Sequence, residues 1–181
     1  SPFLCGVMSA HIYLVGFMGS GKSHWGKRLA EHLGRPFFDL DEVIEAGEGL
    51  TVSTLFSSIG ENGFRELERR YLHQMEHQPP SIVATGGGTP CFFDNMAWMN
   101  AQGTTVYLKI SMPILHQRLV AGKGKRPLLA RLDDSELLRH IETLLEQRDV
   151  FYRQATATVQ RETEDDSKFW EDLTAGYEPR F

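Results

Sequence analysis

The sequence predicts an α/β fold in which helices cover both faces of a parallel sheet. Short apolar runs rich in β-branched and aromatic residues alternate along the chain with longer segments whose apolar residues recur at helical spacing. The 181 residues, of which 41% are hydrophobic and 24% charged, have the length and composition of one globular domain with its own core. We therefore expect a single three-layer domain.

Five short apolar runs are expected to form the strands of that sheet. They are residues 12–15, 37–40, 81–84, 105–108 and 157–159. Helices are expected at residues 22–33, 41–46, 52–58, 61–77, 94–101, 112–120, 134–152 and 166–175. This alternation is typical of parallel strands joined by helical crossovers.

Local signals justify several of the helix ends. Gly34 and Pro36 end the first helix, and the prolines at 79–80 end the long helix before the third strand. Asp133, Asp134 and Ser135 offer side-chain oxygens that can cap the helix that begins near residue 134, where leucine and isoleucine recur at helical spacing.

One flexible, basic stretch interrupts the pattern. Residues 122–127 read Gly-Lys-Gly-Lys-Arg-Pro between two expected helices. We expect a mobile loop over about residues 122–132, inside one domain that spans residues 8–176. Residues 1–7, which precede Met8, are expected to be a leader or an extension.

The charge balance argues against a broad nucleic-acid-binding surface. Nineteen Lys and Arg residues against 24 Asp and Glu residues give a net charge of −5, whereas proteins that bind a phosphate backbone concentrate positive charge over a face. An anion must therefore be held by a small local cluster of basic side chains.

Neither export nor membrane insertion is indicated. No apolar run approaches the roughly 20 residues that cross a bilayer, and no basic segment precedes the short apolar patch near the N-terminus. Cys5 and Cys91 lie far apart, so neither a disulfide scaffold nor a thiolate metal site is expected. We expect a cytoplasmic protein that binds neither membrane nor nucleic acid.

A phosphate-binding motif follows the first expected strand. Residues 16–23 read Gly-Phe-Met-Gly-Ser-Gly-Lys-Ser, which matches G-x-x-x-x-G-K-[ST] where a strand turns into a helix. The glycines let main-chain N–H groups approach phosphate oxygens, Lys22 supplies a charge between phosphates, and the Ser23 hydroxyl is placed for Mg²⁺. The motif predicts a nucleoside triphosphate ligand. Because the chain lacks an Asn-Lys-x-Asp guanine-reading motif, small-molecule kinases are the best class.

Two aspartates lie at the end of the second expected strand. Alternation along a strand would put Asp39 and Asp41 on the same side, at the sheet edge where ligands bind in open α/β folds. One carboxylate could serve Mg²⁺ while the other accepts a proton from an attacking hydroxyl. The alternative is that Asp41 only caps the next helix and Asp39 lies at the surface.

Arg65 and Glu68 are three residues apart, so they are neighbours on one helical face. Glu68 could hold the arginine ready for a substrate carboxylate, although a solvated ion pair would have the same spacing. Residues 86–88, three glycines after the third expected strand, suit a small polyhydroxylated ligand lying against the main chain, or a plain flexible turn.

Six motifs in order, spread over residues 12–159, resemble the shikimate kinases, within the nucleoside-monophosphate-kinase-like group of P-loop proteins. They are Gly-Phe-Met-Gly-Ser-Gly-Lys-Ser, Asp-x-Asp, Gly-Glu-x-x-Phe-Arg, Gly-Gly-Gly, Lys-Arg-Pro-Leu-Leu and Arg-x-x-x-Tyr. The resemblance implies a P-loop fold with strand order 2-3-1-4-5 and a mobile lid. It also implies transfer of the γ-phosphate of ATP to the 3-hydroxyl of shikimate, in the biosynthesis of chorismate and the aromatic amino acids.

The resemblance also implies a role for each matching residue. The shikimate site comprises Asp41, Arg65, Glu68, Gly86, Gly87, Gly88 and Arg148. The ATP site comprises Gly16, Gly19, Ser20, Gly21, Lys22, Ser23, His24 and the lid residue Arg126. The Mg²⁺ site comprises Ser23 and Asp39, and the catalytic residues are Lys22, Asp41 and Arg126. We expect a monomer with ATP and shikimate as its substrates.

Two departures from the family pattern change packing only. His24 and Trp25 follow Ser23 where the family has Thr and a small or aliphatic residue, and Leu40 separates the aspartates where a small polar residue is usual. Two other functions stay open: a sugar-acid kinase such as gluconate kinase, and a binding domain that senses shikimate without turnover.

Overall fold

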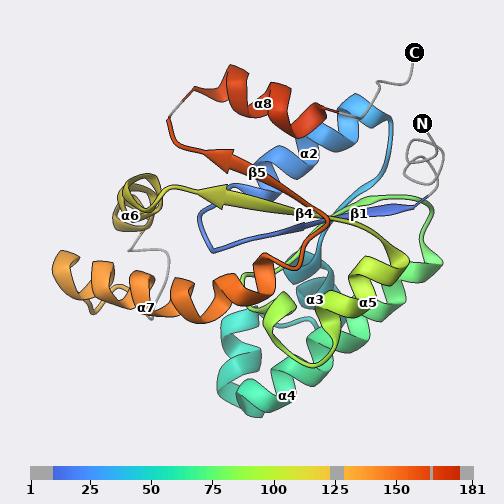
Figure 1. The fold of residues 1–181 in the computed structure, drawn as a ribbon. Coiled ribbons are helices and arrows are strands. Elements are labelled where there is room, and N and C mark those ends of the chain that lie inside the picture. The colour runs from blue at the N-terminus through green and yellow to red at the C-terminus, as the bar shows by residue number, and fades with distance from the viewer. Residues whose placement is uncertain (1–9, 123–128, 164, 176–181) are drawn as a thin grey trace.

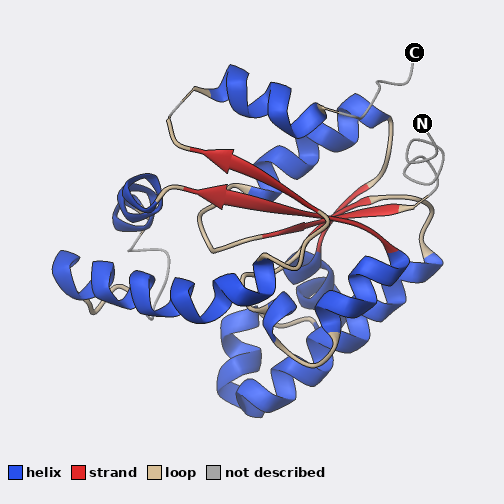
Figure 2. Ribbon diagram, in the orientation of Figure 1, coloured by secondary structure: helices blue, strands red, loops and turns tan. Residues whose placement is uncertain are grey.

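The computed structural model describes residues 10–122, 129–163 and 165–175. A twisted sheet runs through the middle of the described part, with helices α2 and α8 on one side and α4, α5 and α7 on the other (Figure 1). Figure 2 shows the same three layers coloured by secondary structure. The layers confirm the α/β class predicted from the alternating pattern.

The sheet has five parallel strands. They are β1 (His11–Val15), β2 (Phe37–Asp39), β3 (Ile82–Ala84), β4 (Gly103–Ile110) and β5 (Ala157–Arg161). Their order is β2-β3-β1-β4-β5, which confirms the order implied by the family resemblance. Every residue of β1 is buried, as expected for the central strand of a sheet covered on both faces.

The strand register brings the candidate loops to one place. Leu14 of β1 pairs with Ala84 of β3, and Ala84 also pairs with Asp39 of β2. These three parallel strands therefore end at nearly the same level. The segments that follow them start side by side at the carboxyl edge of the sheet.

The helices lie close to the segments predicted from the sequence. They are α2 (Lys22–Leu33), α3 (Leu40–Glu48), α4 (Val52–Gln74), α5 (Asn95–Gln102), α6 (Met112–Ala121), α7 (Asp134–Tyr152) and α8 (Asp166–Thr174), with the 3₁₀ turns η1 (Met75–His77) and η2 (Thr89–Cys91). The two helices predicted over residues 52–77 follow one another as α4, but Gly60 at φ 72° and ψ 176° breaks the helix between them.

Capping explains where several helices begin and end. Gly34 takes a left-handed conformation after α2, at φ 63°. Asp133 and Glu136 form a capping box at the start of α7, so of the three predicted cap residues Asp133 is the cap. Leu40, predicted to end the second strand, instead begins α3, because Asp39 caps that helix.

The core behind the phosphate-binding loop is aromatic. Trp25 on α2 is 1% exposed, and its ring centroid lies 4.8 Å from that of Phe169 on α8. This contact fixes the start of α2 against α8, so the loop before α2 has a rigid support. Within the described ranges, no helix combines the length and apolar character needed to cross a membrane.

Candidate active site

The loop between β1 and α2 is shaped by glycines that admit no side chain. Gly16, Gly19 and Gly21 have φ angles of 150°, 80° and 88°, in a region that L side chains rarely adopt. A Cβ on Gly16 would lie 2.8 Å from the carbonyl oxygen of Leu108. The fold therefore requires glycine here, so no side chain projects from these three positions of the loop.

The Lys22 ammonium lies inside the curve of this loop. Its Nζ donates to the carbonyl oxygens of Gly16 and Phe17 at 2.7 and 2.9 Å, and the residue is 8% exposed. The Ser20 hydroxyl is also buried and has no hydrogen-bond partner among the described residues. Both groups can serve an anion that enters the loop.

Ser23 and Asp39 meet where the loop faces β2. The Ser23 hydroxyl donates to Oδ2 of Asp39, whose Oδ1 accepts from the main-chain N–H groups of Asp41 and Glu42 at 3.0 and 3.3 Å. A hydroxyl and a carboxylate are oxygen ligands of the kind Mg²⁺ prefers, with its other positions left to water and phosphate. The pair therefore fits a magnesium ion held mainly by its nucleotide.

The structure corrects the strand argument for the two aspartates. Because β2 ends at Asp39, Asp41 lies in the first turn of α3, and strand alternation does not place it. The alternative in which Asp41 caps the helix is also wrong, since the cap is Asp39. Asp41 nevertheless reaches the same edge, because α3 starts directly at the end of β2.

Asp41 is in an environment that disfavours its charge. Burial, followed by the negative charges of Asp39 and Glu68, raises the pKa of its carboxyl from 3.8 to about 6, against a smaller opposing effect of Lys22. A carboxyl with a pKa this close to neutrality is suited to exchanging a proton with a substrate hydroxyl.

Gly86 marks the point where the acceptor-side groups converge. The position of a Cβ on Gly86 lies 3.1 Å from Oγ1 of Thr89, 3.2 Å from Oδ1 of Asp41 and 3.3 Å from Oε2 of Glu68. Three polar atoms from η2, α3 and α4 thus surround one glycine. A plain flexible turn would not explain this convergence.

The guanidinium of Arg65 is buried and ordered by contacts on several sides. Its Nη1 donates to Oε1 of Glu68 at 2.9 Å, and the two residues are 6% and 1% exposed. Its Cζ lies 4.2 Å from the ring centroid of Phe92. Nε is buried with no partner among the described residues. The alternative of a solvated ion pair is therefore wrong, and an unused donor remains on a preorganised arginine.

Arg148 approaches the same glycine segment from α7. A Cβ on Gly87 would lie 3.1 Å from Nη1 of Arg148 and 3.3 Å from the main-chain nitrogen of Met18. The carbonyl oxygen of Gly87 accepts a hydrogen bond from Tyr152, whose hydroxyl has its pKa raised chiefly by burial. Gly87 therefore touches both the phosphate-binding loop and the second arginine.

Two of the predicted residues are not placed in this cluster. Arg126 lies outside the described residues, as do residues 123–128 of the expected loop. His24 is exposed, and its ring packs edge-on against Trp25 at 4.9 Å between centroids. Near the end of that loop, Leu129 is 3% exposed and belongs to the core.

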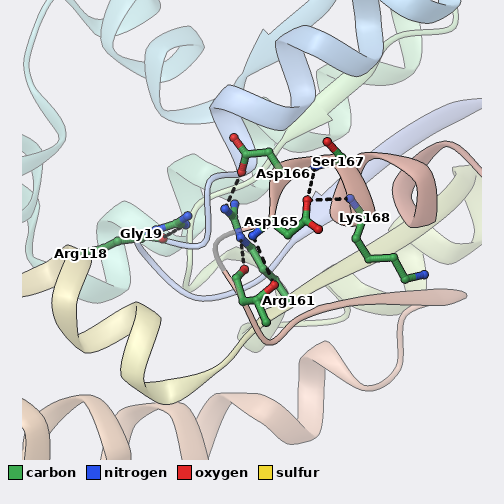
Figure 3. A network of polar contacts seen from close by, with 8 residues as sticks. Gly19, Arg118, Arg161, Asp165, Asp166, Ser167 and Lys168 are labelled. Carbon is green, nitrogen blue, oxygen red and sulfur yellow. Dashed lines mark hydrogen bonds and ion pairs between the residues drawn. The ribbon is translucent and has the colours of Figure 1, made fainter.

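The structure adds two residues that the sequence did not single out. Arg118 reaches from α6 to the phosphate-binding loop and donates to the carbonyl oxygen of Gly19 at 3.1 Å (Figure 3). Thr89, fully buried, donates from its hydroxyl to Oε2 of Glu68 at 2.8 Å. The sequence signal for Thr89 is its position directly after the three glycines that follow β3, whereas Arg118 lies in the last turn of α6 and has no such signal.

Arg161 at the end of β5 lies in the polar network of Figure 3. Its Nε donates to the carbonyl oxygen of Thr163 at 3.0 Å, and its Nη2 donates to Asp166 at the start of α8. The arginine is 5% exposed and its Cζ lies 5.8 Å from the Trp25 ring. It therefore ties the β5–α8 connection to the helix behind the phosphate-binding loop.

Comparison with known proteins agrees with this arrangement. The family model of shikimate kinase matches residues 18–175. A shikimate kinase of Bacteroides fragilis is 49% identical over 144 residues, which cover 80% of this chain and 80% of that protein. The crystal structure of shikimate kinase from Bacteroides thetaiotaomicron superposes with a TM-score of 0.86 at 42% identity, covering 92% of this chain and 95% of the other.

A second solved structure extends the likeness to a liganded relative. The shikimate kinase from Acinetobacter baumannii in complex with shikimate has a TM-score of 0.82 and 32% identity, covering 94% of each chain. The family model covers most of the described chain, from residue 18 within the phosphate-binding loop through the acceptor side. The chain belongs to the shikimate kinase family.

Proposed function

We propose that the protein transfers the γ-phosphate of ATP to the 3-hydroxyl of shikimate, giving shikimate 3-phosphate and ADP. The observation that carries the proposal is the position of Gly87, whose Cβ site lies within 3.3 Å of both the phosphate-binding loop and Arg148. A donor held on the loop and an acidic acceptor held by the arginines would therefore be neighbours, as in-line transfer requires.

On the acceptor side, Arg65 and Arg148 bind the shikimate carboxylate. An arginine fork matches a carboxylate with two parallel hydrogen bonds, and both guanidinium groups lie against neighbouring glycines, Gly88 and Gly87. Asp41 binds the reacting hydroxyl, either as the base that accepts its proton or as a group that only orients it. Gly86 supplies main chain without a side chain, so the sugar-like ring can lie close to these groups.

On the donor side, the main chain of residues 16–23 and the start of α2 bind the phosphates of ATP. Lys22 lies at the carbonyl oxygens of Gly16 and Phe17, and it turns to the β- and γ-phosphate oxygens when nucleotide enters. Arg126, outside the described residues, is proposed to come over ATP. Ser23 and Asp39 hold a magnesium ion, which neutralises phosphate charge when bound.

One steady-state assay of ADP release tests the function. ADP release is measured with shikimate, with gluconate and with no acceptor, for the wild type and for Lys22→Met. The proposal requires release that depends on shikimate and is lost in Lys22→Met. ADP release that occurs with gluconate but not with shikimate would instead indicate a sugar-acid kinase. If calorimetry detects shikimate binding but no ADP is released, the protein would be a sensing domain.

A further inference from the structure

We propose that Thr89 is a positioning residue that holds the substrate-binding arginine through Glu68. The inference rests on the proposed role of Arg65 in binding the shikimate carboxylate. Thr89 donates from Oγ1 to Oε2 of Glu68 at 2.8 Å, and Oε1 of the same carboxylate accepts from Nη1 of Arg65 at 2.9 Å. Each oxygen of Glu68 therefore has one donor, and the two donors together set the plane of the carboxylate.

Glu68 depends on these donors because water is nearly absent around it. The residue is 1% exposed and Thr89 is 0% exposed. A buried carboxylate that loses a donor carries the full cost of its missing solvation. Without the Thr89 hydroxyl, the carboxylate must turn or draw in water, and either change moves its other oxygen away from Arg65.

Thr89 is itself fixed at both ends of its backbone. Its N–H donates to the carbonyl oxygen of Gly86 at 3.2 Å, and its carbonyl oxygen accepts from Nδ2 of the fully buried Asn95 at 2.9 Å. The hydroxyl therefore has a defined position relative to the glycine segment, and the chain of contacts runs from Asn95 to Thr89 to Glu68 to Arg65.

Within the described part of the chain, Arg65 has no second support equivalent to Glu68. Its other carboxylate partner, Glu61, lies 3.6 Å from Nη2 with a side chain that is 59% exposed, so that ion pair is screened by solvent. On the remaining sides the guanidinium meets Gly88 and the Phe92 ring. These contacts limit where it can lie, but among the described residues only Glu68 orients it by a buried hydrogen bond.

The expected consequence is specific to shikimate binding. Thr89→Val keeps the volume of the side chain and removes the donor, so the KM for shikimate should rise roughly tenfold, by analogy with other buried hydrogen bonds to charged groups. The KM for ATP and kcat should stay near their wild-type values, because neither the phosphate-binding loop nor Asp41 loses a contact. Thr89→Ser keeps the hydroxyl and should restore the wild-type KM for shikimate.

Thr105→Val is a matched control. Thr105 is also fully buried, and its hydroxyl donates to Asn100 and accepts from the Thr156 N–H at 2.8 Å near the start of β4. The Thr105→Val variant therefore loses buried hydrogen bonds like Thr89→Val does, but near the amino-terminal edge of the sheet, opposite the candidate site. A general loss of packing should act alike in both variants, whereas the positioning role should change the KM for shikimate only in Thr89→Val.

A double-mutant cycle decides whether Thr89 acts through Glu68. Shikimate KM is measured for the wild type, Thr89→Val, Glu68→Gln and the double variant, with Thr89→Ala in place of Thr89→Val should the latter fail to fold. The proposal requires Thr89→Val to have little further effect once Glu68 is changed. The proposal is overturned if Thr89→Val raises the KM for shikimate by the same factor with Glu68 as with Glu68→Gln. It is also overturned if Thr89→Val has the wild-type KM for shikimate. Lack of turnover with shikimate by the wild type would instead reject the proposed function.

Discussion

Gly88 and the guanidinium of Arg65 occupy adjoining space. A Cβ on Gly88 would lie 2.5 Å from Nη2 and 2.7 Å from Nη1 of Arg65. A flexible side-chain end can usually move aside from such a contact. Here the end is the proposed carboxylate-binding group, held by Glu68 and Phe92, so the absence of a side chain at Gly88 is part of the binding geometry.

Gly88→Ala should therefore reduce shikimate binding without preventing folding. We expect the KM for shikimate to rise roughly tenfold or more, since a loss of 1.4 kcal/mol in binding is a tenfold change. The KM for ATP should change little. Steady-state kinetics with each substrate varied in turn would check this, and a variant with equal rises in both KM values would contradict the assignment.

The raised pKa of Asp41 should appear in the pH dependence of the free enzyme. Because the pKa of Asp41 is about 6, its carboxyl is protonated below that pH. The protonated form cannot accept the proton of the shikimate hydroxyl. We expect kcat/KM for shikimate to fall by about tenfold per pH unit below the pKa. A profile of kcat/KM from pH 5 to pH 8 measures it, and a flat profile through pH 6 would exclude the predicted ionisation.

The same shift should make Asp41 a source of instability at neutral pH. Its pKa rises from 3.8 to about 6 on folding, so the folded state favours the protonated form. Below about pH 4 the carboxyl is protonated in both states, and the relative stability of the fold falls as pH rises through the folded pKa.

Asp41→Asn removes that ionisation and should be more stable than the wild type at pH 8, by up to roughly 3 kcal/mol at about 1.4 kcal/mol per pKa unit. The gain should shrink toward pH 4, while turnover is strongly reduced at every pH. Denaturant unfolding of both proteins at pH 4.5 and pH 8 tests this. A gain that does not depend on pH would mean that the carboxyl titrates normally.

Asp39 has two separable duties, which two substitutions should distinguish. It caps α3 through Oδ1 and meets Ser23 through Oδ2. Asp39→Asn keeps an oxygen for the cap but lowers the charge, so stability should be nearly unchanged while a higher Mg²⁺ concentration is needed for half-maximal rate. Asp39→Ala should also lose about 1 kcal/mol of stability with the cap. Equal stabilities of the two variants would show that the cap contributes nothing.

Arg118 should support nucleotide binding through the loop it touches. Because Nη1 donates to the Gly19 carbonyl oxygen, Arg118→Leu releases one side of the phosphate-binding loop. A lost hydrogen bond of about 1 kcal/mol predicts a rise of roughly fivefold in the KM for ATP. The KM for shikimate serves as the internal control and should not change. A rise in the KM for shikimate alone would contradict the role of Arg118 in nucleotide binding.

The sequence by itself was sufficient for the features that depend on local sterics and periodicity. The spacing in residues 16–23 predicts a phosphate-binding loop because only glycine tolerates φ angles such as 80° at Gly19 and 88° at Gly21. A break between residues 58 and 61 and a cap within residues 133–135 were predicted from a few adjacent residues, and the structure has them at Gly60 and Asp133. The strand order came from the resemblance to a family, since no local pattern encodes it.

Only the tertiary structure decided how the residues of the candidate site act on one another. Asp39 and Asp41 looked equivalent along a strand, yet one caps a helix and the other has a raised pKa, because the strand ends between them. The burial of Glu68 and its link to Thr89 arise from segments 21 residues apart that meet at one sheet edge. Spacing specifies which neighbours a side chain has along its own helix or strand. Solvation and charge depend on neighbours from other elements, which the packing of the whole chain alone brings together.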